Sequence, residues 1–277
     1  MKYPQLIAVL LLATTLAIGQ NKEKIKGSKT VVEKPKEIGE FTGLEIEDNL
    51  TVFLEKGTKN EIKIESDDNL QEAISFDIKE KTLRIYTTKE ISNFKKLSLK
   101  IKYTNDLKSV IAKNASIVNA LEAIQLDTIT FKSLDFAKLY MNVNSKNFNL
   151  IADDKSKIEL NLKAEKSKIQ LNKNAQIKAL IATTDLAFDM HQKTTAIIEG
   201  ETTNAILRQD NNSVFTGINF TIHNADITTE NTAISNLRAD TSLIIDANGL
   251  SKIYLLGTPR IEVRKFLGEA QLIKKAK

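Results

Sequence analysis

The hexapeptide Lys155-Ser-Lys-Ile-Glu-Leu160 is followed almost at once by a near copy, Lys166-Ser-Lys-Ile-Gln-Leu171. In both copies a small polar turn precedes apolar residues that alternate with polar ones. Looser copies occur on either side, beginning at Phe136, Asp185, Asn204, Ala225, Thr241 and Leu250. Repetition of such a unit at short intervals is typical of a stacked β-solenoid. The sequence therefore predicts an all-β fold built from coils.

The spacing of the repeats indicates how the coils are built. Most anchors of the repeat lie close to twenty residues apart, and two gaps are about half as long. One coil with two or more short strands needs roughly twenty residues. Half-period copies are expected when both faces of a coil carry similar strands. We therefore expect a parallel β-solenoid over residues 105–273, with isoleucine and leucine facing a narrow dry core and lysine facing water.

A second pattern occupies residues 38–104. Apolar residues alternate with polar ones over longer stretches, as at Leu44 and Ile46, and the stretches are separated by turn-forming residues. This period of two predicts strands with one buried and one solvated face. One short helical turn is expected within 69–76. We predict that this N-terminal β portion caps or flanks the solenoid.

The first nineteen residues have the features of a signal peptide. Lys2 supplies a positive charge, Leu6 to Ala17 form an apolar run, and Ala17-Ile18-Gly19 places small residues at a cleavage site. We expect cleavage after Gly19; an uncleaved N-terminal anchor is the alternative. Residues 20–37 are rich in lysine and glutamate and are expected to form a flexible linker.

The predicted signal peptide implies an extracytoplasmic protein, in the periplasm, on the outer cell surface or secreted. No second apolar run follows it, so no integral membrane segment is expected after cleavage. The chain has no cysteine, which excludes disulfides, thiol catalysis, thiolate metal sites and a bacterial lipoprotein anchor. Its net charge of +5 comes from lysines interspersed with acidic residues, and it has no tryptophan. This pattern argues against a nucleic-acid partner.

Several segments resemble the bacterial family named putative auto-transporter adhesin, head GIN domain. The resemblance spans about Ile38 to Ile273. It rests on Ile38-Gly-Glu-Phe-Thr-Gly-Leu-Glu-Ile46, Leu50-Thr-Val-Phe-Leu54, Asp68-Asn-Leu70, Leu83-Arg-Ile85, Leu97 to Val110, and the closing strand Ile253-Tyr-Leu-Leu-Gly-Thr-Pro259. It implies a two-part, right-handed, β-helix-like solenoid, extracytoplasmic and of undetermined biochemistry.

The repeated turn departs from this family's pattern. Members of the family carry a Ser-Gly-(Ala/Ser) turn, whereas the corresponding places here hold Ala137, Ser156, Ser167 and Asp185. Glycine adopts left-handed backbone conformations more easily than these residues do. Either the turns have another geometry, or the coils align one or two residues away from these positions.

Few side chains suggest chemistry, and we expect no catalytic, cofactor-binding or metal-binding site. His191 and His223 lie about one and a half coils apart, which favours surface histidines over metal ligands. The oxygen-rich groups Asp67-Asp68, Asp153-Asp154 and Asp210-Asn211-Asn212 lack calcium-loop spacing and are expected to form turns. Asp153 with Asp154 is the best candidate if a calcium ion does bind.

The remaining candidates concern sugars. Pectin-degrading β-helices need a basic residue beside carboxylates, and the nearest such pairs are Arg208-Gln-Asp210 and Arg238-Ala-Asp240. No nucleophile motif or phosphate loop is present in the sequence. Tyrosines are able to stack on sugars, but these are expected to pack within the strands instead. They are Tyr86, Tyr103, Tyr140 and Tyr254.

These observations predict a non-enzymatic adhesion or surface-interaction protein of the bacterial envelope. Its partner is expected to be an unknown protein or glycan surface ligand. One alternative is a structural module that self-associates through open solenoid ends, as a homo-oligomer. The other is a glycan-binding or glycan-cleaving β-helix.

Overall fold

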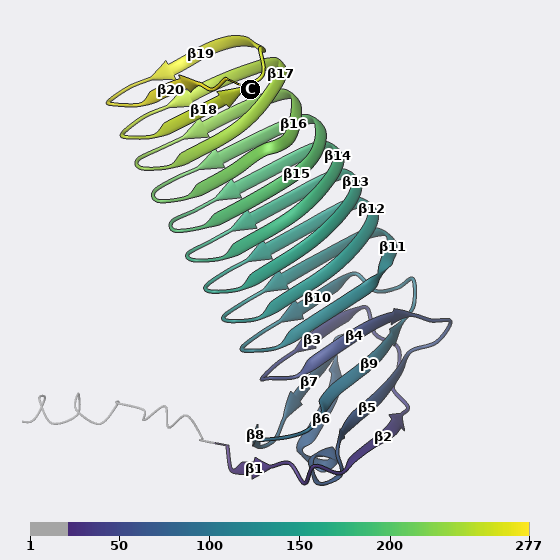
Figure 1. Cartoon of the computed structure of the whole chain (residues 1–277). Helices are drawn as coiled ribbons and strands as arrows, with labels where there is room; N and C mark the ends of the chain where they lie inside the picture. Colours follow the sequence, from purple (N-terminus) through teal and green to yellow (C-terminus); the bar gives the residue numbers. More distant parts are fainter. Residues whose placement is uncertain (1–21, 277) are drawn as a thin grey trace, which may run out of the picture.

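The computed structural model describes residues 22–276 and is a stack of parallel coils (Figure 1). Strands make up 69% of the chain and helix 2%, in a β-solenoid of about 9 turns. The predicted fold class is thus confirmed. The main body consists of seven long strands: β11 (Ile117–Ser133), β12 (Lys138–Ala152), β13 (Lys157–Leu171), β14 (Gln176–Met190), β15 (Thr195–Gln209), β16 (Val214–Thr229) and β17 (Ile234–Ala247).

Each long strand bends in the middle and so contributes to two faces of the solenoid. In β13 the alternation of buried and exposed residues is interrupted where Glu165 and Lys166 are exposed in succession. Ile158 and Leu160 point into the core before this bend, and Ile169 does so after it. We call the sheet formed by the first halves face A and the sheet formed by the second halves face B.

The two hexapeptides are the two halves of one coil. Lys155–Leu160 leads into face A and Lys166–Leu171 runs along face B, so the half-period repeat reflects the two faces. The isoleucines and leucines of both copies are at most 5% exposed, whereas the lysines are exposed. The predicted orientation of this phrase is therefore confirmed.

The coils stack in register along both faces. Ile158 pairs with Ile177 on face A, and Ile169 pairs with Phe188 on face B. Neighbouring strands in a sheet lie about 4.8 Å apart, so equivalent side chains form continuous columns along the axis. Their backbone N–H and C=O groups are paired between coils, and the inward columns form one hydrophobic core.

The tight turn that joins successive coils repeats a left-handed residue. Ten such residues stack along one edge of the solenoid with φ between 51° and 71°: Asp48, Asn114, Asp135, Asp154, Lys173, Gln192, Asn211, Asn231, Gly249 and Gly268. In the next coil an N–H commonly donates to the carbonyl of this residue, as Lys155 does to Asp135 at 2.7 Å. Asparagine and aspartate tolerate this conformation better than most residues, which explains how the turn persists with little glycine.

The four residues that we expected at the repeated turn do not have the left-handed conformation. Ala137 and Ser156 lie two residues after the left-handed position, where they are fully buried. Asp185 lies at the mid-strand bend, in register with Lys166, and Ser167 begins face B just after that bend. None of these four residues therefore occupies the left-handed position of the tight turn.

Shorter strands precede the long ones, and they match the strands expected within residues 38–104. They are β3 (Gly43–Ile46), β4 (Thr51–Lys56), β5 (Glu61–Asp67), β6 (Ile74–Lys79), β7 (Thr82–Thr87), β8 (Glu90–Ser92) and β9 (Leu97–Tyr103), followed by β10 (Ser109–Ala112). The expected helical turn is a 3-10 helix, η1 (Asp68–Ala73).

The N-terminal strands continue the stack and then close it. On face B the order is β6, β7, β3, β10 and the second half of β11; on face A it is β2 (Val31–Lys36), β5, β9, β4 and the first half of β11. The outermost pairings are antiparallel, whereas those of the coils are parallel. Figure 1 shows these strands gathered beneath the coils.

The described part of the expected flexible linker is structured. β1 (Lys24–Lys26) pairs with β8, and β2 (Val31–Lys36) pairs with β5. Val31 and Val32 are partly buried there. The edge of β5 supplies backbone partners that the composition of this segment could not reveal. The predicted signal peptide, residues 1–19, lies outside the described residues. Within 22–276 no helix is long and apolar enough to cross a membrane.

Asp67 connects the N-terminal segment to the cap, by which we mean the short strands β3–β9 that close the N-terminal end of the stack. It is fully buried, and its carboxylate accepts N–H groups from Lys29 at 2.8 Å, Lys95 at 3.1 Å and Lys96 at 2.9 Å. Burial by itself would raise the pKa of Asp67, but these backbone donors outweigh it and hold the pKa below its ordinary value.

We predict that Asp67→Asn lowers the melting temperature at neutral pH. Because the folded-state pKa lies below the ordinary value of 3.8, the carboxylate stabilises the fold above that pH. The stabilisation is lost as the pH falls through the lowered folded-state pKa, so the gap between the two melting curves should narrow there. Thermal unfolding followed by circular dichroism from neutral to acid pH checks this. Asp127→Asn, at a side chain that is 82% exposed, is the control; equal loss in both variants would contradict the role of Asp67.

Gly200 allows two coils to approach closely. It has φ +106°, and a Cβ at this position would lie 2.2 Å from the carbonyl oxygen of Ile181. A backbone atom cannot move aside as a flexible side chain can.

We predict that Gly200→Ala destabilises the protein by about 2–3 kcal/mol, from strain and overpacking. Gly39→Ala is the matched control, because its new Cβ would make an ordinary contact of 3.5 Å with Ile78. Chemical denaturation of both variants checks the difference, and similar midpoints for the two would show that the coils can relax around the new methyl group.

Candidate ligand-binding groove

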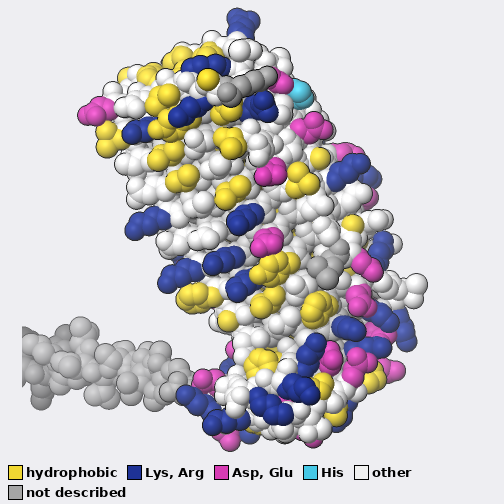
Figure 2. Space-filling view, viewed as in Figure 1, with side chains coloured by type: hydrophobic (Ala, Val, Ile, Leu, Met, Phe, Trp, Pro, Cys, Tyr) yellow, Lys and Arg dark blue, Asp and Glu magenta, His cyan; other side chains and the backbone are white. Residues whose placement is uncertain are grey.

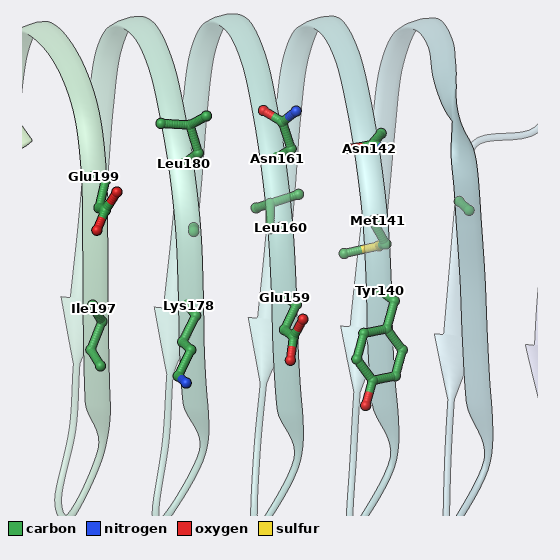
Figure 3. A pocket seen from close by; sticks show the side chains of 12 residues that line it. Tyr140, Met141, Asn142, Glu159, Leu160, Asn161, Lys178, Leu180, Ile197 and Glu199 are labelled. Carbon is green, nitrogen blue, oxygen red and sulfur yellow. The ribbon is translucent and has the colours of Figure 1, made fainter.

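A groove of about 570 Å³ runs across the outside of face A (Figure 3). We call it the lateral groove. It extends from Ala120 in β11 to Glu199 in β15. The five strands β11–β15 are separated by four spacings of about 4.8 Å, which gives a length of about 19 Å between the outer strands. Its volume lies within the range of about 300–1,000 Å³ that is usual for ligand sites.

Two rows of side chains border the lateral groove. The strand register places each side chain beside its equivalent in the next coil. One row is Tyr140, Glu159, Lys178 and Ile197, and the other is Asn142, Asn161, Leu180 and Glu199. Successive outward residues of a strand lie about 6.7 Å apart. The rows therefore border a track parallel to the solenoid axis, lined between them by Met141, Leu160 and Ala179.

The lateral groove presents mixed chemistry to solvent. Leu180 is 51% exposed and Ile197 is 40% exposed, at outward positions where polar residues are usual. In the part of the chain that the structure describes, Tyr140, Glu159 and Lys178 make no hydrogen bond or ion pair with other side chains. An aromatic ring, carboxylates, an ammonium group and aliphatic side chains thus remain available to a ligand.

The backbone of the lateral groove is not available to a ligand. Every strand beneath it pairs on both sides with a neighbouring coil. A ligand in this groove therefore contacts side chains, and it cannot add a strand to the sheet there. Such a surface suits an extended polymer or a flat patch of another macromolecule.

The structure separates the two histidines. His191 lies in the tight turn after β14, with Nδ1 2.8 Å from Oδ2 of Asp210, and His223 lies in the bend of β16, with Nδ1 3.0 Å from Oδ1 of Asp240. Burial tends to raise the pKa of Asp210, but hydrogen bonds from His191 and the Gln192 N–H lower it overall. Each histidine thus pairs with a carboxylate of the next coil.

The oxygen-rich turns engage protein groups. Nζ of Lys173 lies 2.7 Å from Oδ1 of Asp154 and 3.2 Å from Oδ1 of Asp153. The hydrogen bonds to Asp154 and then Asp153 raise the pKa of Lys173. The ammonium group therefore lies against the pair that we considered for calcium. Among residues 22–276 no three histidine or acidic side chains gather as metal ligands do.

The arginine–aspartate pairs and most tyrosines lie outside the lateral groove. Arg208 contacts Asp189 at 3.5 Å on face B, while Asp210 and Asp240 pair with the histidines. The side chain of Arg84 lies over the ring of Tyr86, and that of Lys275 lies over the ring of Tyr254. Tyr103 is buried, and this burial raises its pKa to about 12. Of the four tyrosines, the lateral groove contains Tyr140.

Sequence reasoning did not identify the lateral groove as a unit. One signal was present, because Leu180 and Ile197 are apolar at outward positions of strands whose inward positions are also apolar. The rows are formed by residues nineteen positions apart, as the pairing of Glu159 with Lys178 shows. Only the exact stacking register reveals which of them are neighbours.

Comparison with family models gives one match, to the family described as "Putative auto-transporter adhesin, head GIN domain". The match covers residues 40–179 and 157–259. The two matched segments overlap over 157–179, as is reasonable for repeated coils that satisfy one pattern. No curated protein matches the sequence.

Several solved structures share this fold. A putative adhesin from Parabacteroides merdae superposes with a TM-score of 0.67 at 13% identity, covering 92% of this chain and 100% of its own. A putative lipid binding protein from Parabacteroides distasonis gives 0.66 at 11% identity, covering 92% and 100%. A putative adhesin from the same species gives 0.66 at 11% identity, covering 91% and 100%. At these identities the similarity shows the fold alone.

Proposed function

This chain belongs to the putative auto-transporter adhesin, head GIN domain family. We propose that it is a non-enzymatic surface-interaction protein that binds a ligand along its lateral groove. The ligand class is a protein or glycan of a cell surface or extracellular matrix. The observation that carries the proposal is the exposure of Leu180 and Ile197 beside unpaired Tyr140, Glu159 and Lys178.

The rigidity of the wall supports binding without large rearrangement. The lateral groove lies on β-strands whose backbone pairs continuously between coils. Its side chains are therefore held at a fixed spacing before the ligand arrives, which lowers the entropic cost of association. A repetitive track of this kind matches a repetitive or extended ligand.

The arrangement of acidic groups supports a binding role over catalysis. Glu159 and Glu199 are the acids of the lateral groove, and they lie two coils apart in different rows. The corresponding separation of their Cα atoms is about 12 Å. Glycosidases hold two carboxyl groups about 5–9.5 Å apart across one bond, whereas no hydrogen bond or ion pair with another described side chain orients Glu159 toward Glu199. A glycan-cleaving role is the alternative that product analysis addresses.

We predict that the double variant Leu180→Asp, Ile197→Asp loses ligand binding by at least about tenfold. Both side chains are already exposed, so the fold should tolerate the change. Screening the chain on glycan and matrix-protein arrays identifies a ligand, and titration measures the loss.

Ile206→Asp is the matched control, because Ile206 is 45% exposed on face B. It should bind as the unchanged chain does. Equal binding by the groove variant would place the ligand site elsewhere, and any cleaved glycan product would replace adhesion with an enzymatic role.

We also propose that the chain acts outside the cytoplasm, without a lipid anchor on cysteine. The support is the signal-like segment 1–19 and the absence of cysteine. N-terminal sequencing of the protein exported by its host should give Gln20 as the first residue. A cytoplasmic protein that begins at Met1 would contradict this location.

A further inference from the structure

The C-terminal end of the stack leaves two strands with one partner each. Face B ends at β19 (Arg260–Phe266), which pairs with β17 alone, and face A ends at β20 (Gln271–Lys274), which pairs with β18 (Lys252–Leu256) alone. The outer edges of β19 and β20 therefore present backbone donors and acceptors that no described residue pairs. Such an edge is a template for another strand.

The core columns also reach the surface at this end. Ile261, Val263 and Phe266 are 43%, 51% and 40% exposed. Their register partners one coil earlier are Leu243, Ile245 and Ala247, which are at most 2% exposed. These are inward positions of a coil that has no successor within the described chain. Figure 2 shows hydrophobic and basic side chains together at the top of the view, where Figure 1 places β18–β20.

The N-terminal end is built differently. Its outer strand on face A, β2, contains Pro35 between Lys34 and Lys36. Proline has no N–H to donate, and lysines flanking it disfavour further pairing at an edge. The other outer strand, β6, ends with the exposed Lys79. A strand is therefore accepted more readily at the C-terminal end than at the N-terminal end, and a head-to-tail filament lacks a matching surface.

The charge of the C-terminal end indicates which kind of partner can bind there. Residues 260–276 contain five basic side chains and two acidic ones. Arg264 contacts Asp226 and Glu262, but Arg260, Lys265 and Lys274 make no ion pair within the described chain. Two copies meeting through this end would bring like charges together. A bilayer would leave the edge N–H and C=O groups unpaired in its apolar interior.

We infer that the C-terminal end binds an extended segment of a partner protein in which apolar and acidic residues alternate, by adding it as a strand beside β19. Its backbone would pair with the free edge, its apolar side chains would continue the columns of Ile261 and Val263, and its acidic side chains would meet Arg260 and Lys265. This surface is separate from the lateral groove, so the inference stands whether or not the groove binds a ligand.

The test uses the whole chain and a fluorescent synthetic peptide of about eight residues, the length of an ordinary strand, in which glutamate and valine alternate. We expect binding by fluorescence anisotropy and slower hydrogen exchange of the β19 amides. A peptide with lysine in place of glutamate should bind at least about tenfold more weakly, and so should the glutamate–valine peptide with N-methylated amides.

Two variants locate the contact. The double variant Ile261→Asp, Val263→Asp and the double variant Arg260→Glu, Lys265→Glu should each weaken binding by about tenfold or more. Circular dichroism confirms that they remain folded. Leu180→Asp with Ile197→Asp, which changes two similarly exposed apolar residues of the lateral groove, should leave peptide binding unchanged.

Four outcomes would overturn the inference. The first is that the glutamate–valine peptide does not bind. The second is that both end variants bind it as well as the unchanged chain does. The third is a concentration-dependent dimer that only the end variants lose, because a second copy would then be the occupant. The fourth is binding to vesicles of anionic lipid that the end variants lose, because a membrane would then be the occupant.

Discussion

The hydrogen bonding of each coil to the next is the constraint on which the rest of this molecule depends. A coil of about nineteen residues cannot bury its own apolar side chains, and its backbone polar groups need partners outside it. Parallel pairing in register meets both needs at once. It aligns the inward columns into one core, and it requires every coil to turn at the same place. The stacked left-handed residues at the tight edge are the consequence, and mostly asparagine and aspartate fill them where glycine is absent.

The same constraint divides the surface into two kinds. Along the sides the strand backbones pair between coils except at a few register shifts, so a ligand there would contact side chains, as we propose for the lateral groove. At the two ends the pairing between coils stops, and the two ends differ in structure. The N-terminal end turns to antiparallel strands, carries Pro35, and is secured by the buried carboxylate of Asp67. The C-terminal end remains a parallel edge with Ile261 and Val263 exposed. The two proposed binding modes therefore use different kinds of surface on one fold.

Regular stacking also explains why most of the polar candidate residues contact a partner one coil away. Residues that are distant in sequence become neighbours one coil away, and the polar ones pair with each other along the axis. The side chain of His191 contacts Asp210, that of His223 contacts Asp240, and that of Lys173 contacts Asp154. These contacts give each carboxylate a polar partner on the surface of the solenoid. In the lateral groove, several side chains have no such partner and lie beside two exposed apolar residues, Leu180 and Ile197.

The sequence by itself determined the fold class, the inward and outward residues of the repeated hexapeptides, and the presence of repeats at full and half period. These features are local, because period-two alternation and turn chemistry operate over a few residues. It predicted that Ile158 and Leu160 would be buried and that Lys157 would be exposed. Only the tertiary structure decided which coils lie in register, where the left-handed turn falls, and that β2 joins the cap. Those features depend on the length of every intervening coil and on partners far away in the chain. For the same reason the row from Tyr140 to Ile197 exists in the stack and is invisible in any single coil.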